Sequence, residues 1–265
     1  MSGPDLAVLA AHLAEETGAL RAVLEGAPAQ AWVTATPAQG WSVADQVSHL
    51  AYFDEAATTS VLDAARFAQL VDDAVAGGLG FCDLLAERYR DRTPTELLAW
   101  WQEARGAMVA AMLAAGPSAR VPWYGVEFSV ASSMTGRIME TWAHGQDVCD
   151  ALNVEHQVTA ALFDVARLCA RTRANSYAAR GRAVPEGDVD VVLSSPGGET
   201  WRFGEVGGEV IRGDAIEFCL VATQRRNAAD TSLDASGPNA AEWLTIAQAF
   251  AGPAGPGRPP AEVVA

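Results

Sequence analysis

The hydrophobic pattern of this chain changes near Gly181, and this change limits the folds that the chain can adopt. Before it, apolar residues recur with the period of one face of a helix. After it, short apolar runs bounded by turn residues read as strands, as in Val189–Ser194 and Glu199–Phe203. The pattern predicts an α+β protein, with a helical bundle at residues 1–181 and a small α+β domain with a Pro/Gly-rich tail at residues 182–265.

Two helix starts in the first part carry strong capping signals. Ser42-Val-Ala-Asp45 resembles a capping box with Asp in place of Glu, and Thr93-Pro-Thr-Glu96 combines a Thr N-cap, a Pro at the first position and a Glu at the third. Long helices with short connections predict a bundle. We expect helices at 5–24, from 42 past 56, 60–75, 80–90, 93–115, 129–151 and 160–179.

The downstream part is less regular. We expect Glu209–Ile211 to continue the β structure, and Asp214–Thr223 is apolar enough for either a strand or a helix. Asn239–Phe250 is predicted to be a helix.

Charge and cysteine content narrow the possible partners. The formal charge of −15, from 18 basic and 33 acidic residues, argues against binding to nucleic acid or to an anionic membrane. The longest near-apolar run, Ala107–Ala115, is about half of the ~20 residues that span a bilayer. Four scattered cysteines and an N-terminus without a secretion signal predict reduced thiols and a cytoplasmic location. A small molecule is therefore the expected partner, and the sequence does not indicate an oligomeric state.

Glu140 and His144 lie one helical turn apart, so both side chains can reach one point in space. His49, in another predicted helix, offers a third ligand, and two His with one carboxylate form the ligand set of an open, catalytic divalent-metal site. Asp147 could orient the second ring nitrogen of His144, or it could be a solvated residue in the last turns of the helix. The alternatives are a simple Glu140–His144 ion pair and a buried His49 bonded to Asp45. The other two histidines, His12 and His156, are predicted to lie on the surface.

Two segments resemble a known family. Gly40-Trp-Ser-Val43, followed by His49-Leu50 and Phe53-Asp54, resembles the second helix of DinB-like metal-binding bundles. Arg137-Ile-Met-Glu140-Thr-Trp-Ala-His144-Gly-Gln-Asp147 resembles the matching motif of the mycothiol-dependent maleylpyruvate isomerase family within that superfamily. The resemblance covers roughly residues 5–180. Gln224-Arg225-Arg226 and Trp243–Gly252 resemble an actinobacterial subgroup of uncharacterised members.

The resemblance implies a DinB-like bundle in which zinc, or another divalent metal, is held by His49, Glu140 and His144. It implies mycothiol as the thiol cosubstrate of a transferase or isomerase acting on an electrophilic small molecule. In that family an Arg of the C-terminal domain contributes to activity, and Arg225 and Arg226 are the candidates for this catalytic role. Arg137 could bind a substrate carboxylate from the bundle, because a guanidinium pairs well with carboxylates. Arg225 and Arg226 could instead be ordinary exposed residues.

Two other functions remain open at this stage. The chain could be a metal-dependent hydrolase or tailoring enzyme that uses metal-bound water without a thiol cofactor. It could also be a non-catalytic binding protein in which a metal only ties two helices together. Turnover insensitive to mycothiol would favour the first alternative, and a closed coordination sphere would favour the second.

Overall fold

The computed structural model describes residues 5–255 and 257–261. The chain forms two compact units, unit 1 (Met1–Ala161) and unit 2 (Leu162–Ala265). The hydrophobic pattern predicts this boundary after residue 181. The helix that begins at Ala161 instead packs with downstream strands, since the ring of Phe163 lies 5.1 Å from that of Trp201. Helices followed by a small mixed sheet confirm the predicted α+β class.

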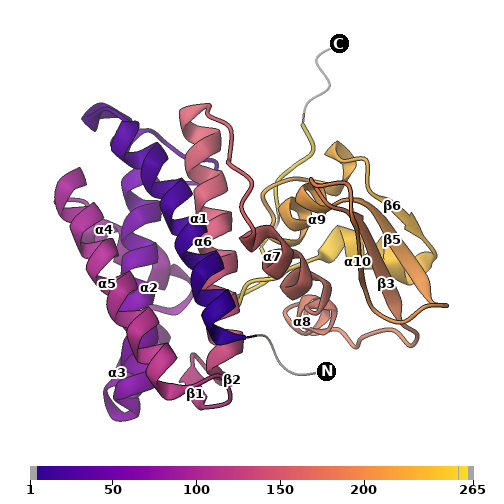
Figure 1. The fold of residues 1–265 in the computed structure, drawn as a ribbon, viewed down its shortest axis with the longest axis horizontal. Coiled ribbons are helices and arrows are strands. Elements are labelled where there is room, and N and C mark those ends of the chain that lie inside the picture. The colour runs from indigo at the N-terminus through magenta and orange to yellow at the C-terminus, as the bar shows by residue number, and fades with distance from the viewer. Residues whose placement is uncertain (1–4, 256, 262–265) are drawn as a thin grey trace. The chain divides into compact units, whose positions relative to one another are not determined.

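Unit 1 is a helical bundle (Figure 1). Two helices, α3 and α4, pack against α2 and are shorter than the other helices of the bundle. No helix in the described part of the chain is long and apolar enough to cross a membrane. The four long helices are α1 (Leu6–Gly26), α2 (Val43–Leu62), α5 (Pro94–Ala115) and α6 (Val130–Leu152), and the short ones are α3 (Ala64–Gly77) and α4 (Phe81–Tyr89).

The bundle core comes from the apolar faces of these helices. Trp101 of α5 is completely buried against residues of α1 and α2. Burying one large apolar side chain stabilises a fold by roughly 1.5–3 kcal/mol, so this cluster fixes how the helices pair. Its buried members are Leu20, Leu24, Trp32, Val43, Val47, Leu50, Ala51, Leu97, Trp101 and Val148.

Both predicted capping boxes are present. The backbone N–H of Ser42 donates to Asp45 Oδ2 at 2.8 Å while Ser42 Oγ accepts from the backbone N–H of Asp45. Thr93 and Glu96 make the same reciprocal pair at the start of α5. These bonds satisfy N–H groups that a helix start leaves unpaired. They therefore set the residue at which each helix begins.

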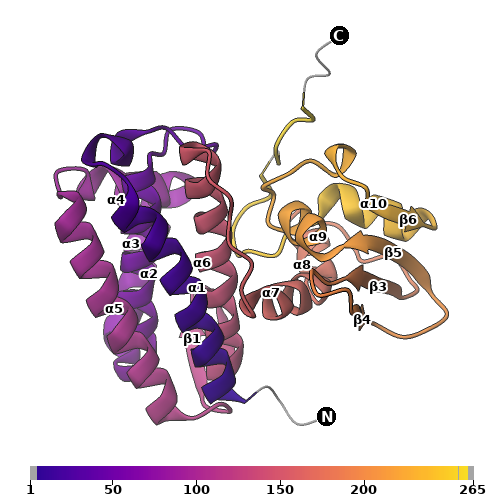
Figure 2. The ribbon, with the colours of Figure 1, turned by 45° about the horizontal axis from the view of Figure 1, so that its top comes forward.

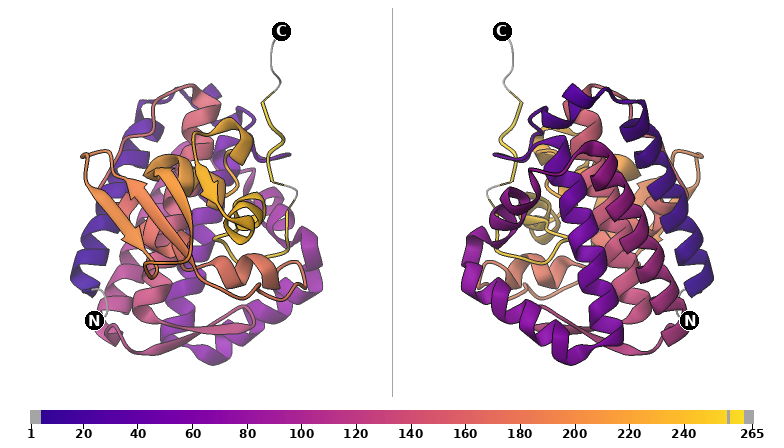
Figure 3. Two further views of the ribbon diagram at one scale, coloured as in Figure 1. Left: turned by 90° about the vertical axis from the view of Figure 1, so that its right-hand side faces the viewer. Right: turned by 90° about the vertical axis from the view of Figure 1, so that its left-hand side faces the viewer.

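A hairpin of β1 (Arg120–Trp123) and β2 (Val126–Ser129) leads directly into α6 (Figure 3). Its turn contains Gly125, whose φ of 88° lies in the left-handed region that favours glycine. Ser60 Oγ donates to the carbonyl of Pro122 at 2.7 Å and ties the hairpin to α2. The following Trp123 and Tyr124 rings pack among the aromatic residues of α2, α3 and α4.

Unit 2 contains a four-stranded sheet with the order β4-β3-β5-β6, in which β3 and β5 are parallel and the other pairs are antiparallel (Figure 2). The ring of Phe218 in α9 lies 6.1 Å from that of Trp243 in α10, so these two helices share a core. The strands are β3 (Val189–Ser194), β4 (Thr200–Phe203), β5 (Glu209–Asp214) and β6 (Asp234–Ser236), and the helices are α7 (Ala161–Ala170), α8 (Arg173–Ala178), α9 (Ala215–Ala222) and α10 (Pro238–Ile246).

One expectation for this part needs correction, and one alternative that the sequence left open is resolved. The single helix expected at 160–179 is two helices, because Thr172 makes a tight turn in which its N–H and Oγ1 both donate to the carbonyl of Cys169. The ambiguous segment 214–223 is a helix, because Asp214 caps it by accepting from the N–H groups of Ile216 and Glu217.

Candidate metal centre

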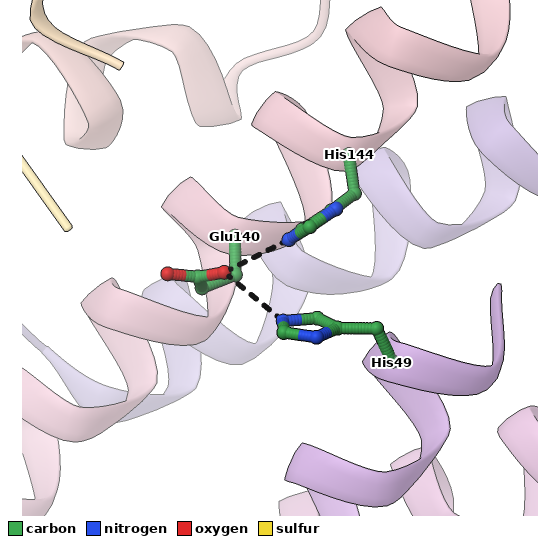
Figure 4. Close-up of side chains that lie close together, drawn as sticks. All are labelled: His49, Glu140 and His144. Atoms are coloured by element: carbon green, nitrogen blue, oxygen red, sulfur yellow. Dashed lines mark hydrogen bonds and ion pairs between the residues drawn. The ribbon is translucent and has the colours of Figure 1, made fainter. Parts of the chain in front are cut away.

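His49, Glu140 and His144 converge between α2 and α6, as Figure 4 shows. Glu140 Oε2 lies 3.2 Å from His144 Nε2 and 3.8 Å from His49 Nε2. One ligand atom from each residue falls within 4.8 Å of the other two. The structure therefore brings together the three residues that the sequence singled out as metal ligands.

The site depends on the antiparallel register of α2 and α6. Three contacts follow one another along the pair: Gln46 with His144, His49 with Glu140, and Asp54 with Arg137. Residue numbers rise on one helix as they fall on the other, with steps of roughly one helical turn. The Ser42–Asp45 capping box begins α2 and so sets the positions of Gln46 and His49.

Gln46 holds His144 in the orientation that a metal ligand needs. Its Nε2 donates to Thr36 Oγ1 at 2.8 Å, so its Oε1 is the atom that meets Nδ1 of His144. An amide oxygen can only accept, which places the proton of a neutral His144 on Nδ1. Nε2 then keeps its lone pair on the side of Glu140. Gln46 was not among the residues predicted from the sequence, although it lies three residues before His49 on the same side of the helix.

The electrostatics of the cluster favour a neutral His49 and an ionised Glu140. Burial, the neighbouring His144 and the positive charge of Arg137 lower the pKa of His49 to about 4, against the opposing effect of Glu140. Burial alone would raise the pKa of Glu140, but the adjacent side chains of His144 and His49 and the charge of Arg137 hold it well below its usual value. A histidine or carboxylate must be deprotonated to bind a metal. His49 and Glu140 therefore have the protonation states that a divalent cation requires.

Aromatic rings surround His49. The ring of Phe53 lies 4.5 Å from it and that of Trp41 lies 5.2 Å from it. Trp41 is held in place by a 2.8 Å hydrogen bond from its Nε1 to Asp83. His49 Nδ1 is buried and has no hydrogen-bond partner among the described residues, and Asp45 instead pairs with Arg90. The alternative of a His49–Asp45 hydrogen bond is therefore wrong.

One turn away lies a buried ion cluster that the sequence analysis did not foresee. Asp54 is completely buried and accepts from Arg105 Nε at 2.7 Å and from Arg137 Nε at 3.0 Å. Arg105 also donates to Thr17 and Thr141, so its guanidinium links α1, α5 and α6. A buried carboxylate needs this pairing, because an unpaired buried charge is strongly destabilising.

Asp147, Arg225 and Arg226 were also predicted to belong to the site, and their roles stay predictions. Asp147 is buried on α6, and its effect on His144 stays a prediction. Arg225 and Arg226 lie in unit 2, in the turn after α9, where both backbone N–H groups donate to the carbonyl of Leu220. Arg225 also donates from Nη1 to the carbonyl of Thr223 at 2.8 Å. Their catalytic role stays a prediction.

The surface assignment of His156 is wrong. Its side chain is 10% exposed and its Nε2 lies 2.9 Å from Oε1 of the buried Glu16, while Nδ1 lies 3.1 Å from Gln146. Thr159 also donates to Glu16. His156 therefore ties the segment after α6 to α1, which is a structural role within unit 1.

Comparisons with known proteins identify similar chains and a similar fold. Residues 13–149 match the family model described as the mycothiol maleylpyruvate isomerase N-terminal domain. Two uncharacterised proteins from two strains of Mycobacterium tuberculosis are 40% identical over 195 residues, which cover 73% of this chain and 76% of each relative. Crystal structures of the mycothiol-dependent maleylpyruvate isomerase and of its histidine-to-alanine mutant share the fold, with TM-scores of 0.58 and 0.59 at 14% identity. Each of these two structural matches covers 90% of this chain and 98% of the solved chain.

Proposed function

Because the chain belongs to the family defined by the mycothiol maleylpyruvate isomerase N-terminal domain, we propose that it is a metal-dependent enzyme of the isomerase or transferase kind that uses mycothiol. Its substrate is an electrophilic small molecule. One observation carries the proposal: His49, Glu140 and His144 present three ligand atoms within 4.8 Å of one another. Cofactor and reaction come to this chain through its family, because the solved structures at 14% identity support the fold alone.

The residues present fit a divalent cation. Two neutral imidazoles and one carboxylate suit zinc, and also nickel or iron. When bound, the ion would supply positive charge that favours the thiolate form of mycothiol over the thiol. The chain itself orients His144 through Gln46 and surrounds His49 with the rings of Trp41 and Phe53.

The reaction type depends on the fate of the thiol adduct. In an isomerase the thiolate adds to a carbon–carbon double bond, the new single bond rotates, and the thiolate leaves again. In a transferase the adduct takes up a proton and is released with its new carbon–sulfur bond. For Arg225 and Arg226 we propose contacts to a substrate carboxylate, because guanidinium groups bind carboxylates through paired N–H donors.

The test combines metal content with thiol binding. We expect about one metal ion per chain by mass spectrometry in wild type and in His12→Ala, and its loss in His49→Ala and His144→Ala. Isothermal titration should detect mycothiol binding to the metal-loaded protein only. His12 is the matched control, because it is a histidine outside the cluster.

Other outcomes would change the assignment. Bound metal without affinity for mycothiol would overturn the thiol-dependent proposal in favour of a hydrolase or tailoring enzyme. Bound metal with a closed coordination sphere, whose removal only lowers the melting temperature, would indicate a binding protein. Wild-type protein that takes up no metal would remove the basis of the proposal.

A further inference from the structure

The two histidines of the candidate metal centre are held in place in different ways. The Nδ1 atom of His144 meets the amide oxygen of Gln46. The Nδ1 atom of His49 is buried and has no hydrogen-bond partner among the described residues. An imidazole that binds a metal usually donates its other ring N–H to a neighbouring acceptor, and this bond fixes the orientation of the ring. Because His49 has no such bond, its ring must be oriented by the side chains packed against it.

One aromatic ring packs against both histidines. The ring of Trp41 lies 5.2 Å from that of His49 at an interplanar angle of 55°, and 6.1 Å from that of His144 at 17°. Ring pairs at roughly 4.5–7 Å attract each other with a preferred geometry. Phe53 also contacts His49, but it lies on the same helix one turn later. Trp41 approaches from the segment before α2 and therefore supports His49 from outside its own helix.

Trp41 is in turn bound to α4. Its Nε1 donates to Asp83 Oδ1, near the start of α4, at 2.8 Å. At the end of this helix, Arg90 donates from Nη2 to the carbonyl of Gly40 at 3.0 Å and from Nε to Asp45 at 3.1 Å. Hydrogen bonds to a carboxylate are stronger than those between neutral groups. Both ends of α4 are therefore bonded to the segment that carries Trp41 and begins α2.

We propose that Trp41 is a positioning residue of the candidate metal centre, and that its bond to Asp83 makes the orientation of the His49 ring depend on α4. The bond holds the indole plane against the two imidazoles. This packing keeps Nε2 of His49 on the side of Glu140, whose Oε2 lies 3.8 Å away. A metal site requires its ligand atoms at defined distances and angles, so a displaced imidazole binds the ion less well. That the cluster holds a metal rests on the proposed function.

Substitutions of Asp83 test this bond without disturbing the core, because its side chain is exposed. Asp83→Leu removes the acceptor, whereas Asp83→Asn removes the charge and keeps an oxygen that can accept from the indole. Trp41→Phe removes the donor. The control is Glu55→Leu, because the exposed Glu55 of α2 accepts from Nε1 of Trp100 at 2.7 Å in the same way but is not part of the cluster.

Cobalt(II) in place of zinc reports the ligand geometry, because its visible absorption depends on the arrangement of the ligands. Asp83→Leu and Trp41→Phe should change the positions and intensities of the cobalt bands. Both should also weaken zinc binding by about 3–10-fold, the usual effect of losing one hydrogen bond. Asp83→Asn and Glu55→Leu should match wild type in the cobalt spectrum and in zinc affinity.

Two results would overturn the positioning role. In the first, Asp83→Leu has the same cobalt spectrum and zinc affinity as Glu55→Leu. In the second, Asp83→Asn is altered as strongly as Asp83→Leu, which would show that the charge of Asp83 acts on the site and its hydrogen bond does not. The two Asp83 variants decide the question even where Trp41→Phe fails to fold.

Nuclear magnetic resonance of the metal-free protein separates this inference from the proposed function. The chain has four histidines, so the ring signals of His49 can be assigned from their absence in His49→Ala. They should shift in Asp83→Leu but not in Asp83→Asn. This pattern in a protein that takes up no metal would overturn the proposed function and leave the positioning role standing. Unchanged His49 signals in Asp83→Leu, with metal and mycothiol binding intact, would overturn the positioning role alone.

Discussion

Gln46 controls the state of His144 through the direction of its amide. The amide oxygen meets Nδ1 of His144 while the amide nitrogen donates to Thr36. We expect Gln46→Leu to weaken zinc binding by about 10–100-fold, because the ring loses the acceptor that fixes its tautomer and orientation. Competition with a chelating dye would measure the dissociation constant.

Two further variants make this prediction specific. Gln46→Glu keeps an acceptor for Nδ1 and should retain most of the zinc affinity. Gln69→Leu changes an exposed glutamine of α3 and should leave the affinity unchanged. If Gln46→Leu binds zinc as tightly as Gln69→Leu does, Gln46 has no influence on the metal centre.

Cys149 of α6 should make the stability of the fold sensitive to alkaline pH. Burial, with help from Asp150 and Glu16, raises the pKa of its thiol to about 11 from an ordinary value of 9.0. Between these two values the unfolded chain loses the proton while the folded chain keeps it, so stability is complete below pH 9 and falls as the pH rises towards 11.

Urea denaturation at a series of pH values checks this effect. The midpoint of Cys149→Ala should depend less steeply on pH than that of wild type between pH 9 and 11. The residual slope comes from other groups, including Cys82, whose pKa burial also raises to about 11. The difference between the two proteins should be constant from pH 7 to 8. Parallel curves up to pH 11 would mean that the folded and unfolded thiols titrate alike.

Among single residues, the sequence identifies the candidate metal ligands better than the residues that hold them in place. Glu140 and His144 can be paired from their spacing, because residues four apart share a helix face. Gln46 could not be assigned in this way, since an amide in a helix carries no distinctive spacing. The Asp54 cluster joins residues far apart in the chain, and only packing shows that they meet. His156 was misplaced for the same reason, since its partner Glu16 is on α1.

Among the elements, α5 begins with a capping box that can be tested directly. Thr93 Oγ1 accepts from the N–H of Glu96, and Glu96 Oε2 accepts from the N–H of Thr93. Thr93→Ala should lower the free energy of unfolding by about 1 kcal/mol, the usual effect of losing an N-cap side chain. Chemical denaturation followed by circular dichroism would measure the change.

Thr95→Ala is the control, because Thr95 is also exposed and lies in the same turn but does not cap the helix. It should change the free energy by no more than about 0.5 kcal/mol. If both variants lose the same free energy of unfolding, the capping hydrogen bond of Thr93 does not contribute to stability.

Element boundaries were predictable where a local signal exists. The starts of α2 and α5 follow from their capping boxes, and the turn between β3 and β4 from Pro196 and Gly198. The break between α7 and α8 carries no Gly or Pro and is made by Thr172, which bonds back to Cys169. Such side-chain-to-backbone bonds compete with the helix at positions that a hydrophobic pattern does not mark.

Across the whole molecule, the change of period near Gly181 correctly separates the helix-rich part of the sequence from the part that forms the four-stranded sheet. It does not mark where the compact units divide. Helices α7 and α8 keep a helical pattern but pack with unit 2, through contacts such as Phe163 with Trp201. Periodicity reports local structure, whereas membership of a unit depends on tertiary contacts that a single sequence does not display.

The division into units predicts where a bound metal stabilises the chain. All three candidate ligand residues belong to unit 1, and they lie on α2 and α6. A ligand at about 100 times its dissociation constant stabilises the state that binds it by about 2.7 kcal/mol. Hydrogen exchange with mass spectrometry should therefore show slower exchange in peptides of α2 and α6 when zinc replaces a chelator. Peptides of β3 and β5 should be unaffected, and His144→Ala should show no response. A similar slowing in β3 and β5 would contradict a site confined to the bundle, because unit 2 would then share in the binding.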